Sequence, residues 1–381
     1  MRKLRVRNST LIILGILALL HLYIGWRVLP DLPFAMPAKA IGAAWLAASC
    51  ILVPAGLMAH GIRSQPLADR MTWAGMLALG LFSSLLVLTF LRDLMLGAAA
   101  LTGVLGPALL KWSAIAVPAL AGLATLVGFL NARRVAAVVD VEVPIAGLPE
   151  ALHGFTIAQI SDIHVGPTIK RGYLDGIVDA VNALDADLVA VTGDLVDGSV
   201  RRLAQHTAPL ARLRARHGAC FVTGNHDYYS GAHEWIPEVR RLGLRVLLNE
   251  HVVLEHRGAS LLVAGVTDYS AHHFDETHRS DPHAAIAGAP DTVGARILLA
   301  HQPRSALRAA DAGFDLQLSG HTHGGQFLPW NFFVPMQQPW VAGLNRLRNM
   351  WIYVSRGTGY WGPPKRFGAP SEITRVRLVR A

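Results

Sequence analysis

Long uncharged stretches of apolar residues dominate the first third of the chain. Four of them, at residues 8–26, 40–62, 71–91 and 112–132, are long enough to cross a bilayer as a helix, which takes about 20 residues. Each is flanked by Arg or Lys. We therefore predict a transmembrane region at residues 1–134. The first stretch is read as a retained anchor rather than a cleaved signal peptide, because three further spans follow it.

Residues 94–110 are also uncharged, but Gly103 and Pro107 interrupt them. They are interpreted as a re-entrant or interfacial segment, or alternatively as a fifth span. Four spans with the N-terminus inside leave eight Lys and Arg residues on the inner side and four on the outer side. A fifth span would weaken this bias to seven against five. The positive-inside rule therefore favours four spans and a cytoplasmic C-terminal domain.

Beyond residue 134, short apolar runs typical of strands alternate with segments of helical spacing. Residues 135–154 are expected to form a linker and a first strand. Helices are expected at residues 172–184, 203–216 and 235–242. Further strands are expected at residues 155–160, 188–192, 219–223, 246–248, 252–255, 261–266, 297–300, 316–319, 352–355 and 372–378. Alternating strands and helices predict a layered α/β domain over residues 155–381.

The net charge of +9 first suggests a nucleic-acid-binding protein, but its distribution does not support one. Residues 1–139 hold 12 Lys and Arg against 3 Asp and Glu, whereas residues 140–381 hold 23 of each. The excess positive charge therefore lies in the membrane region, and no nucleic-acid partner is expected. Fifteen of the 17 His residues lie in the second part, which makes it the place to look for chemistry.

Polar clusters follow five of the predicted strands, where ligand sites collect in open α/β sheets. They are Asp162-x-His164, Gly193-Asp194, Gly224-Asn225-His226-Asp227, His301 and Gly320-His321-x-His323. Side chains alternate along a strand, so Asp162 and His164 are expected to point the same way. Nitrogen and oxygen donors without thiolate suit Mn²⁺, Fe or Zn²⁺. The donors are too many for one ion and about right for two, an arrangement that serves displacement at phosphorus.

This ordered set resembles the calcineurin-like metallophosphoesterases. The motifs around Asp162, Asp268, His301 and His321, and the tail at residues 355–368, resemble its membrane-associated bacterial phosphodiesterases. The resemblance implies a four-layer α/β/β/α sandwich after the transmembrane helices. It also implies that Asp162, His164 and His323 hold one divalent metal ion, that Asn225, His301 and His321 hold a second, and that Asp194 bridges the two. Manganese is the expected metal, with iron or zinc as alternatives.

The resemblance further implies hydrolysis by attack of a metal-bound hydroxide on phosphorus. His226 would then lie beside the scissile phosphate, and Asp227 would orient it and keep it protonated for the leaving oxygen. Arg356 and Arg366 are candidates for binding a substrate phosphate, since arginine binds phosphate oxygens in a bidentate manner. A solvated basic turn is the alternative for these arginines.

We therefore expect a multi-pass enzyme of a bacterial inner membrane that hydrolyses a phosphodiester or pyrophosphate bond. Its substrate is expected to be a lipid or a lipid-linked nucleotide, in line with the phospholipids and UDP-diacylglucosamine to which members of the resembling branch have been linked. The alternatives are a phosphodiesterase for soluble nucleotides and a non-catalytic membrane sensor of phosphate ligands.

The stretch between Gln326 and Tyr353 is rich in aromatic residues, and its prolines exclude a regular helix. Two interpretations stay open. The stretch either dips into the membrane interface and receives acyl chains, or folds over the core of its own domain.

Overall fold

This computed structural model describes residues 2–62 and 64–381 and divides them into two units. The first unit comprises residues up to Leu130 together with Gly362–Lys365, and the second comprises Asn131–Trp361 and Arg366–Ala381. The second unit contains the predicted α/β domain.

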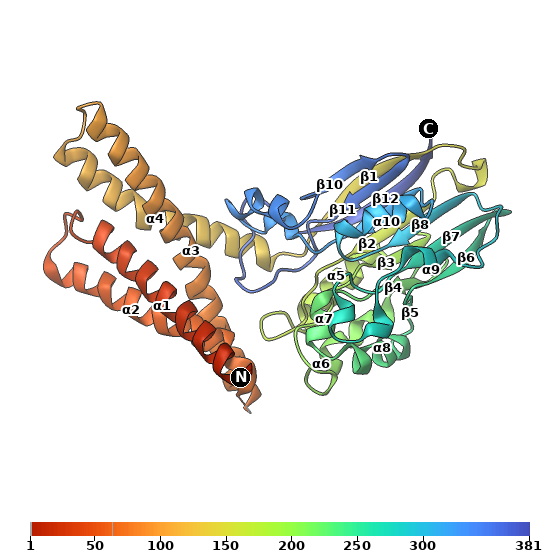
Figure 1. Cartoon of the computed structure of the whole chain (residues 1–381), viewed down its shortest axis with the longest axis horizontal. Coiled ribbons are helices and arrows are strands. Elements are labelled where there is room, and N and C mark those ends of the chain that lie inside the picture. The colour runs from red at the N-terminus through yellow and green to blue at the C-terminus, as the bar shows by residue number, and fades with distance from the viewer. Residues whose placement is uncertain (1, 63) are drawn as a thin grey trace. The chain divides into compact units, whose positions relative to one another are not determined.

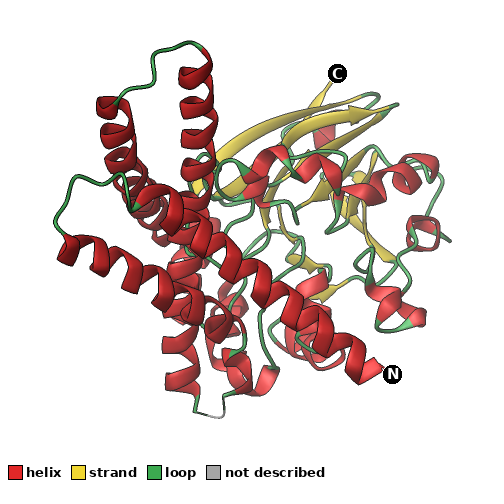
Figure 2. Ribbon diagram, turned by 60° about the vertical axis from the view of Figure 1, so that its left-hand side comes forward, coloured by secondary structure: helices red, strands yellow, loops and turns green. Residues whose placement is uncertain are grey.

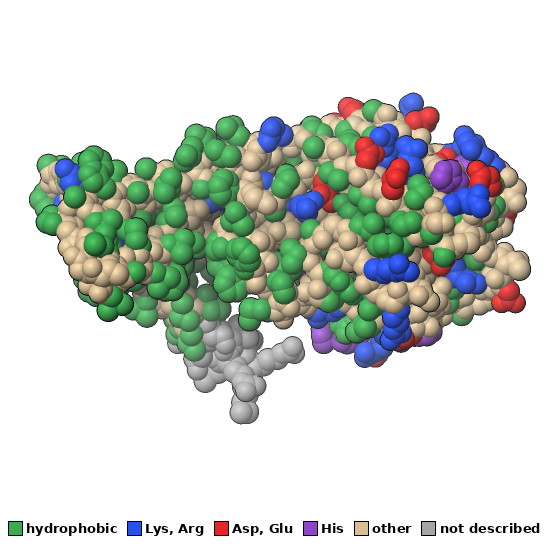
Figure 3. Space-filling view, turned by 90° about the horizontal axis from the view of Figure 1, so that it is seen from above, with side chains coloured by type: hydrophobic (Ala, Val, Ile, Leu, Met, Phe, Trp, Pro, Cys, Tyr) green, Lys and Arg blue, Asp and Glu red, His purple; other side chains and the backbone are tan. Residues whose placement is uncertain are grey.

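The helical unit is built from four helices that are long and apolar enough to span a membrane. They are α1 (Arg2–Val28), α2 (Met36–Leu57), α3 (Gln65–Leu101) and α4 (Pro107–Arg133), which runs on into the second unit (Figure 1). The prediction of about four transmembrane helices is thus confirmed. The surface of these helices is mostly hydrophobic, whereas charged side chains gather on the other unit (Figure 3).

The segment at residues 94–110 forms neither a separate span nor a re-entrant loop. Its first part continues α3, which is 37 residues long, and its last part begins α4. A helix of that length extends about 55 Å, well beyond the roughly 30 Å of a bilayer core. Charges near its end are paired. Asp93 accepts hydrogen bonds from Tyr23 at 2.7 Å and Arg27 at 2.9 Å, and Arg92 pairs with Asp31.

The domain contains two six-stranded sheets (Figures 1 and 2). The first sheet has the order β1-β12-β2-β3-β4-β5 and the second the order β10-β11-β9-β8-β7-β6. In the first, β2, β3, β4 and β5 run parallel, and in the second β7, β8, β9 and β11 do. The strands of the first sheet are β1 (Ala137–Ile145), β2 (Thr156–Ile160), β3 (Leu188–Val191), β4 (Ala219–Phe221), β5 (Arg245–Val246) and β12 (Glu372–Arg380). Those of the second are β6 (Glu250–His256), β7 (Ala259–Gly265), β8 (Ala295–Leu299), β9 (Leu316–Ser319), β10 (Gly343–Leu347) and β11 (Met350–Val354).

Three buried apolar layers hold the sandwich together. The middle layer joins the facing sides of the two sheets, with Ile157 and Leu188 from one and Leu261 and Ile297 from the other. The outer face of the first sheet is covered by α5 (Arg171–Asn182), α6 (Val200–Thr207) and α8 (Ala232–Arg241). The outer face of the second is covered by α9 (Pro282–Ile286) and α10 (Ala306–Asp311). This is the predicted α/β/β/α arrangement.

The predicted elements and the structure differ in several places, among them the short helices α7 (Asn225–Tyr229), α9 and α10, which were not predicted. The helix expected at residues 203–216 ends at Thr207, and a 3-10 turn, Ala208–Arg212, follows it. Pro209 explains the change, because it lacks the N–H that an α-helix needs there. Strand β10 was not predicted. It lies within the aromatic stretch but starts after the last of the prolines, at Gly343.

Candidate metal centre

The polar clusters of the sequence meet where parallel strands of the two sheets end. Asp162 follows β2, Asp194 follows β3 and Asn225 follows β4 in the first sheet, while His301 follows β8 and His321 follows β9 in the second. Hydrogen bonds join the two sheets at this edge: the backbone N–H of His321 donates to the Asp162 carboxylate at 3.0 Å. Residues far apart in the chain thus share one site.

The loops that carry these residues adopt an unusual backbone conformation. Five of the predicted ligands have positive φ angles: Asp162 (53°), His164 (55°), Asp194 (51°), His321 (71°) and His323 (51°). Strand β2 ends at Ile160, so Asp162 and His164 lie beyond it. The alternation of side chains along a strand, on which the prediction was based, therefore does not explain how these two residues are oriented. Both belong to the same cluster, and both have a left-handed backbone conformation. Such backbone strain is typical of functional sites.

One cluster contains Asp162, His164 and His323, all buried. The Nε2 atoms of the two histidines lie 3.1 Å apart, and Nε2 of His323 lies 3.5 Å from Oδ1 of Asp162. The nitrogen and oxygen atoms therefore converge on one point, as the ligands of a metal ion do.

A second cluster contains Asp194, His301 and His321. Nε2 of His301 lies 3.2 Å from Nδ1 of His321 and 3.1 Å from Oδ2 of Asp194. The other ring nitrogen of His301, Nδ1, lies 2.8 Å from the carbonyl oxygen of Thr192. A hydrogen bond of this kind fixes the ring and leaves Nε2 facing the cluster.

Asp194 lies between the two clusters. Its Oδ2 atom is 3.1 Å from Nε2 of His301 in the second cluster and 3.8 Å from Nε2 of His164 in the first. Its Oδ1 atom accepts the backbone N–H of His226 at 2.8 Å, which holds the carboxylate in place. This is the position that a bridging carboxylate requires.

Asn225 supplies a test of whether these residues fit a metal ion. Its Oδ1 atom is buried and, among the described residues, accepts no hydrogen bond. A buried amide oxygen without a partner is costly, so it indicates a ligand that the protein itself does not supply. Together with the imidazoles and carboxylates, it completes a nitrogen and oxygen donor set that suits divalent ions such as Mn²⁺ or Zn²⁺.

Carboxylates give the site a field that favours positive charge. Although burial lowers the pKa of the His164 imidazole, Asp197 and Asp194 raise it to about 9. Burial likewise lowers the pKa of His301, but Asp194 raises it well above its usual value. Conversely, burial raises the pKa of Asp194, and His301 lowers it well below its usual range. An ionised Asp194 beside cationic rings marks a place where a metal cation would replace bound protons.

The other two histidines are held in the neutral form that binds metals. Burial lowers the pKa of His321, with the charge of His301 adding to it, to about 3. Burial and the neighbouring Arg366 lower the pKa of His323 well below its usual value. Both imidazoles can therefore offer a lone pair at neutral pH.

His226 contacts a different carboxylate from the one predicted. Nδ1 of His226 lies 2.7 Å from Oδ1 of Asp197. The Asp227 carboxylate instead accepts the backbone N–H groups of Gly224, Asp194 and Leu195 at 2.8–3.0 Å. The prediction that Asp227 orients His226 is therefore wrong, because these three amide groups occupy its oxygens and fix the loops.

Asp197 is the site residue that the sequence analysis missed. It contacts His226 and also His164, whose Nδ1 lies 3.2 Å from its Oδ2 atom, and the charge of His164 helps to lower its pKa to about 2 despite burial. The available signal was the spacing Gly193-Asp194-Leu195-Val196-Asp197, which puts a second carboxylate in the loop that follows β3.

The two arginines proposed for substrate phosphate differ in the structure. Arg366 is fully buried, and its guanidinium donates to the carbonyl oxygens of His323 at 2.9 Å and Arg356 at 2.8 Å, and also to Gly359. The prediction that Arg366 binds substrate is therefore wrong, since its donors hold the backbone around His323. Arg356 is partly exposed and pairs with Glu372 at 2.8 Å, so it stays a candidate.

Comparisons with known proteins agree with this geometry. A family model described as calcineurin-like phosphoesterase matches residues 155–325. An uncharacterized metallophosphoesterase of Aquifex aeolicus is 32% identical over 224 residues, which cover 58% of this chain and 84% of that protein. The chain belongs to the calcineurin-like phosphoesterases. Members of this family use divalent metal ions, and in this chain the domain follows four helices that are long and apolar enough to span a membrane.

Two vertebrate relatives combine such a domain with a membrane region. The proteins called "Transmembrane protein with metallophosphoesterase domain" in Danio rerio and Bos taurus are 40% and 41% identical over 262 and 280 residues. The matches cover 67% and 69% of this chain, and 60% and 63% of the relatives. The chain therefore spans about three fifths of the length of these two metallophosphoesterases.

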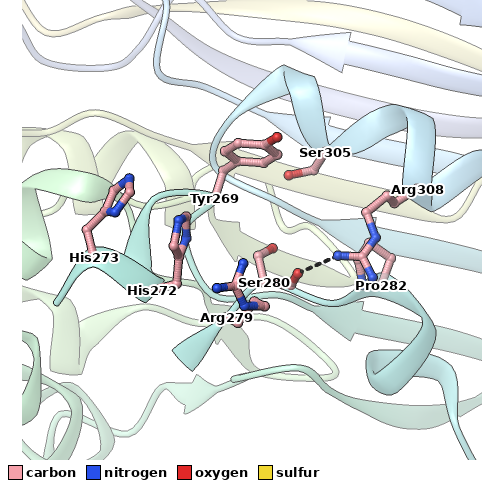
Figure 4. A pocket seen from close by; sticks show the side chains of 8 residues that line it. All are labelled: Tyr269, His272, His273, Arg279, Ser280, Pro282, Ser305 and Arg308. Carbon is pink, nitrogen blue, oxygen red and sulfur yellow. Dashed lines mark hydrogen bonds between the residues drawn. The ribbon is translucent and has the colours of Figure 1, made fainter. Parts of the chain in front are cut away.

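A polar cavity of about 340 Å³ lies elsewhere in this phosphoesterase domain (Figure 4). Arg308 borders it and donates to the carbonyl oxygen of Ser280 at 3.2 Å. Its lining consists of Tyr269, His272, His273, Arg279, Ser280, Pro282, Ser305 and Arg308. None of the predicted metal ligands lines it, so it is distinct from the metal centre.

Replacing Arg366 by methionine is expected to lower the free energy of unfolding by about 3 kcal/mol or more. The change leaves several buried carbonyl oxygens without donors, each costing about 1–3 kcal/mol. The measurement is denaturant or thermal unfolding of the detergent-purified chain. Arg212→Met is the matched control, because Arg212 pairs with Asp175 and Asp179 on the surface and its loss should cost less than about 1 kcal/mol. Equal destabilisation by both changes would contradict the role given to Arg366.

Proposed function

We propose that this protein hydrolyses a phosphodiester or pyrophosphate bond of a lipid or lipid-linked nucleotide. The observation that carries the proposal is the convergence of two ligand clusters on Asp194, with His226 beside them. Asp162, His164 and His323 would hold one ion, and Asn225, His301 and His321 the other. When bound, two such ions neutralise phosphoryl oxygens and generate a nucleophile from water.

His226 would act as the general acid in this proposal. Its Nδ1 atom faces the Asp197 carboxylate, so Nε2 is the atom left to donate a proton to the leaving oxygen. Asp197 would be a positioning residue that fixes the ring. Arg356 would contribute a cation for a second phosphate oxygen.

The lipid part of the proposal is supported by the apolar helices and by the aromatic rings of Tyr229 and Trp361 beside His226. We further propose that the chain lies in a bacterial inner membrane with the phosphoesterase domain in the cytoplasm. The eight-to-four bias of positive residues supports this orientation.

The test is hydrolysis by the detergent-purified full chain, stripped with EDTA and then reloaded with Mn²⁺, Fe²⁺ or Zn²⁺. The substrates are bis-p-nitrophenyl phosphate, mixed phospholipids, UDP-diacylglucosamine and soluble cyclic and linear nucleotides. We expect turnover to disappear with EDTA, to return with metal, and to be fastest on a lipid. Faster hydrolysis of soluble nucleotides would favour a phosphodiesterase for soluble nucleotides over a lipid hydrolase. If the metal-loaded protein hydrolyses none of the substrates, a non-catalytic sensor of phosphate ligands is favoured.

Replacing His226 by alanine is expected to lower kcat about 10²–10⁴-fold on alkyl phosphodiesters, the usual contribution of a general acid. The loss should be much smaller on bis-p-nitrophenyl phosphate, because p-nitrophenolate leaves without a proton. The measurement is kcat and KM for both substrates, with metal content determined in parallel. His233→Ala is the control, since His233 is exposed and pairs with Asp275 on the surface. Equal losses on both substrates would argue against proton donation by His226.

A further inference from the structure

An exposed apolar segment follows the metal-ligand motif of the phosphoesterase domain. Residues 324–345 contain no Asp, Glu, Lys or Arg. Within them, residues 327–336, here called the interfacial segment, form two 3-10 turns, Trp330–Phe332 and Val334–Met336. Its exposed large side chains are Leu328, Trp330, Phe332, Phe333 and Met336, with Phe332 71% and Met336 80% accessible. A patch this apolar marks a surface that meets another partner.

Both ends of the interfacial segment are fixed to the domain. At the start, Phe327 is buried and the backbone N–H of Leu328 donates to the carbonyl oxygen of Phe367 at 2.9 Å. Just after its end, Gln338 is buried, and its Nε2 atom donates to Oε1 of Gln302 at 3.1 Å. The segment is thus anchored while its large side chains face outward, which does not agree with a loop folded over its own core.

Exposed aromatic side chains also lie beside the metal centre, close to the start of the segment. Gln326 joins Trp361 to the segment, because its amide accepts the backbone N–H of Trp361 and donates to the Trp361 carbonyl oxygen, both at 2.8 Å. The ring of Trp361 lies 5.4 Å from the His226 ring, and that of Tyr229 lies 5.1 Å from it. Both aromatic rings are exposed. A ligand bound beside His226 would therefore lie close to two exposed aromatic rings.

A lipid bilayer is the partner that this chain itself brings within reach. Helix α4, the last of the membrane helices, ends at Arg133, and β1 of the phosphoesterase domain begins at Ala137. This short connection tethers the domain to the end of a helix that could span the membrane. Tryptophan and phenylalanine are the residues that favour the headgroup region, and the lack of charge removes the penalty for entering it.

We propose that the interfacial segment inserts into the headgroup–acyl boundary of the bilayer that holds the chain's own helices. Phosphoester lipids then pass from this boundary to the metal centre along Trp361 and Tyr229. The proposed insertion is inferred only from the exposed apolar surface of the segment, whereas the lipid path also rests on the proposed function.

The insertion is tested with a fluorescent label in proteoliposomes. In a Cys50→Ala background, where Cys220 is buried, Phe332→Cys and Met336→Cys are labelled with an NBD fluorophore. Arg214→Cys and Glu276→Cys, at exposed polar positions of the same domain, are the controls. Spin-labelled phospholipids carry the quencher at a shallow or a deep position. We expect about two-fold quenching at 332 and 336, stronger with the shallow quencher because interfacial burial reaches only about 5–10 Å, and none at the controls.

Absence of quenching at both 332 and 336 would overturn the insertion, whatever the enzyme activity of the samples. Hydrolysis of bis-p-nitrophenyl phosphate by the same samples reports on the proposed function separately. Quenching without any hydrolysis would support insertion of the segment into the membrane and would contradict the proposed enzyme activity.

The lipid path is tested by a double substitution, Phe332→Ser with Met336→Ser. We expect lipid turnover to fall about tenfold or more while turnover of the soluble ester is unchanged, since neither residue touches the metal centre. If turnover of both substrates is unchanged, the proposed lipid path is wrong, but the assignment of the metal ligands is unaffected.

Discussion

Replacing Asp194 by asparagine is expected to lower metal-dependent hydrolysis by roughly 10³-fold or more. Its carboxylate faces His301 in one cluster and His164 in the other, at 3.1 and 3.8 Å. Even residues that only support a metal ligand contribute about 10–100-fold, so a shared ligand should contribute more. The amide keeps the shape of the side chain, but it removes the negative charge from between the clusters.

The measurement combines kcat on bis-p-nitrophenyl phosphate with metal content per chain. We expect metal content to fall with activity, because the remaining carboxylates cannot balance two divalent ions. Asp179→Asn, which removes a surface carboxylate that pairs with Arg212, should change neither quantity. Full activity of the Asp194→Asn variant would show that catalysis does not use this centre.

The positions of the ligand motifs were predictable from sequence because a simple rule places them. Each of Asp162, Asp194, Asn225, His301 and His321 follows a short apolar run. Carboxyl ends of parallel strands share an edge of their sheet, so the motifs of each sheet had to meet. That the two sheets would bring their edges together came from the family resemblance, since strand spacing alone does not specify how sheets pack.

The partners of individual side chains were harder to predict. Asp227 is next to His226 in sequence, yet the first turn of α7 (Asn225–Tyr229) directs its carboxylate to backbone N–H groups. Asp197, 29 residues before His226, takes the place expected for it. A carboxylate's partner depends on loop conformation, and the left-handed residues of these loops carry no pattern in the sequence.

The burial of Arg366 in the basic tail was likewise not predictable from the sequence. Arg366 appears in a turn of Gly and Pro residues, where a charged side chain is normally solvated. The structure instead buries its guanidinium among carbonyl oxygens. In the membrane region, the third span was expected to end at residue 91, but helix α3 runs on to Leu101, and the charges of Arg92 and Asp93 within it are paired.

Replacing Gly320 by alanine is expected to abolish metal binding at the first cluster. A Cβ atom at this position would lie 2.0 Å from Oγ of Ser161 and 2.2 Å from Oδ2 of Asp162, both inside contact distance. Ser161 is held by a hydrogen bond to the Thr192 carbonyl oxygen at 3.1 Å and is fully buried, so the strain falls on the Asp162 carboxylate. A methyl group forced into such packing also costs about 1–3 kcal/mol of stability.

Metal content and hydrolysis of bis-p-nitrophenyl phosphate measure this effect, with thermal unfolding as the third quantity. We expect activity to fall at least about 100-fold, more than the loss for residues that only support a ligand. The matched control is Gly172→Ala on α5, where a Cβ atom meets nothing within 4 Å and helix propensity predicts slight stabilisation. If Gly320→Ala retains both metal and activity, then either the Asp162 carboxylate shifts and still binds the metal, or Asp162 is not a ligand. Asp162→Asn distinguishes the two, because only a ligand would lose metal on that change.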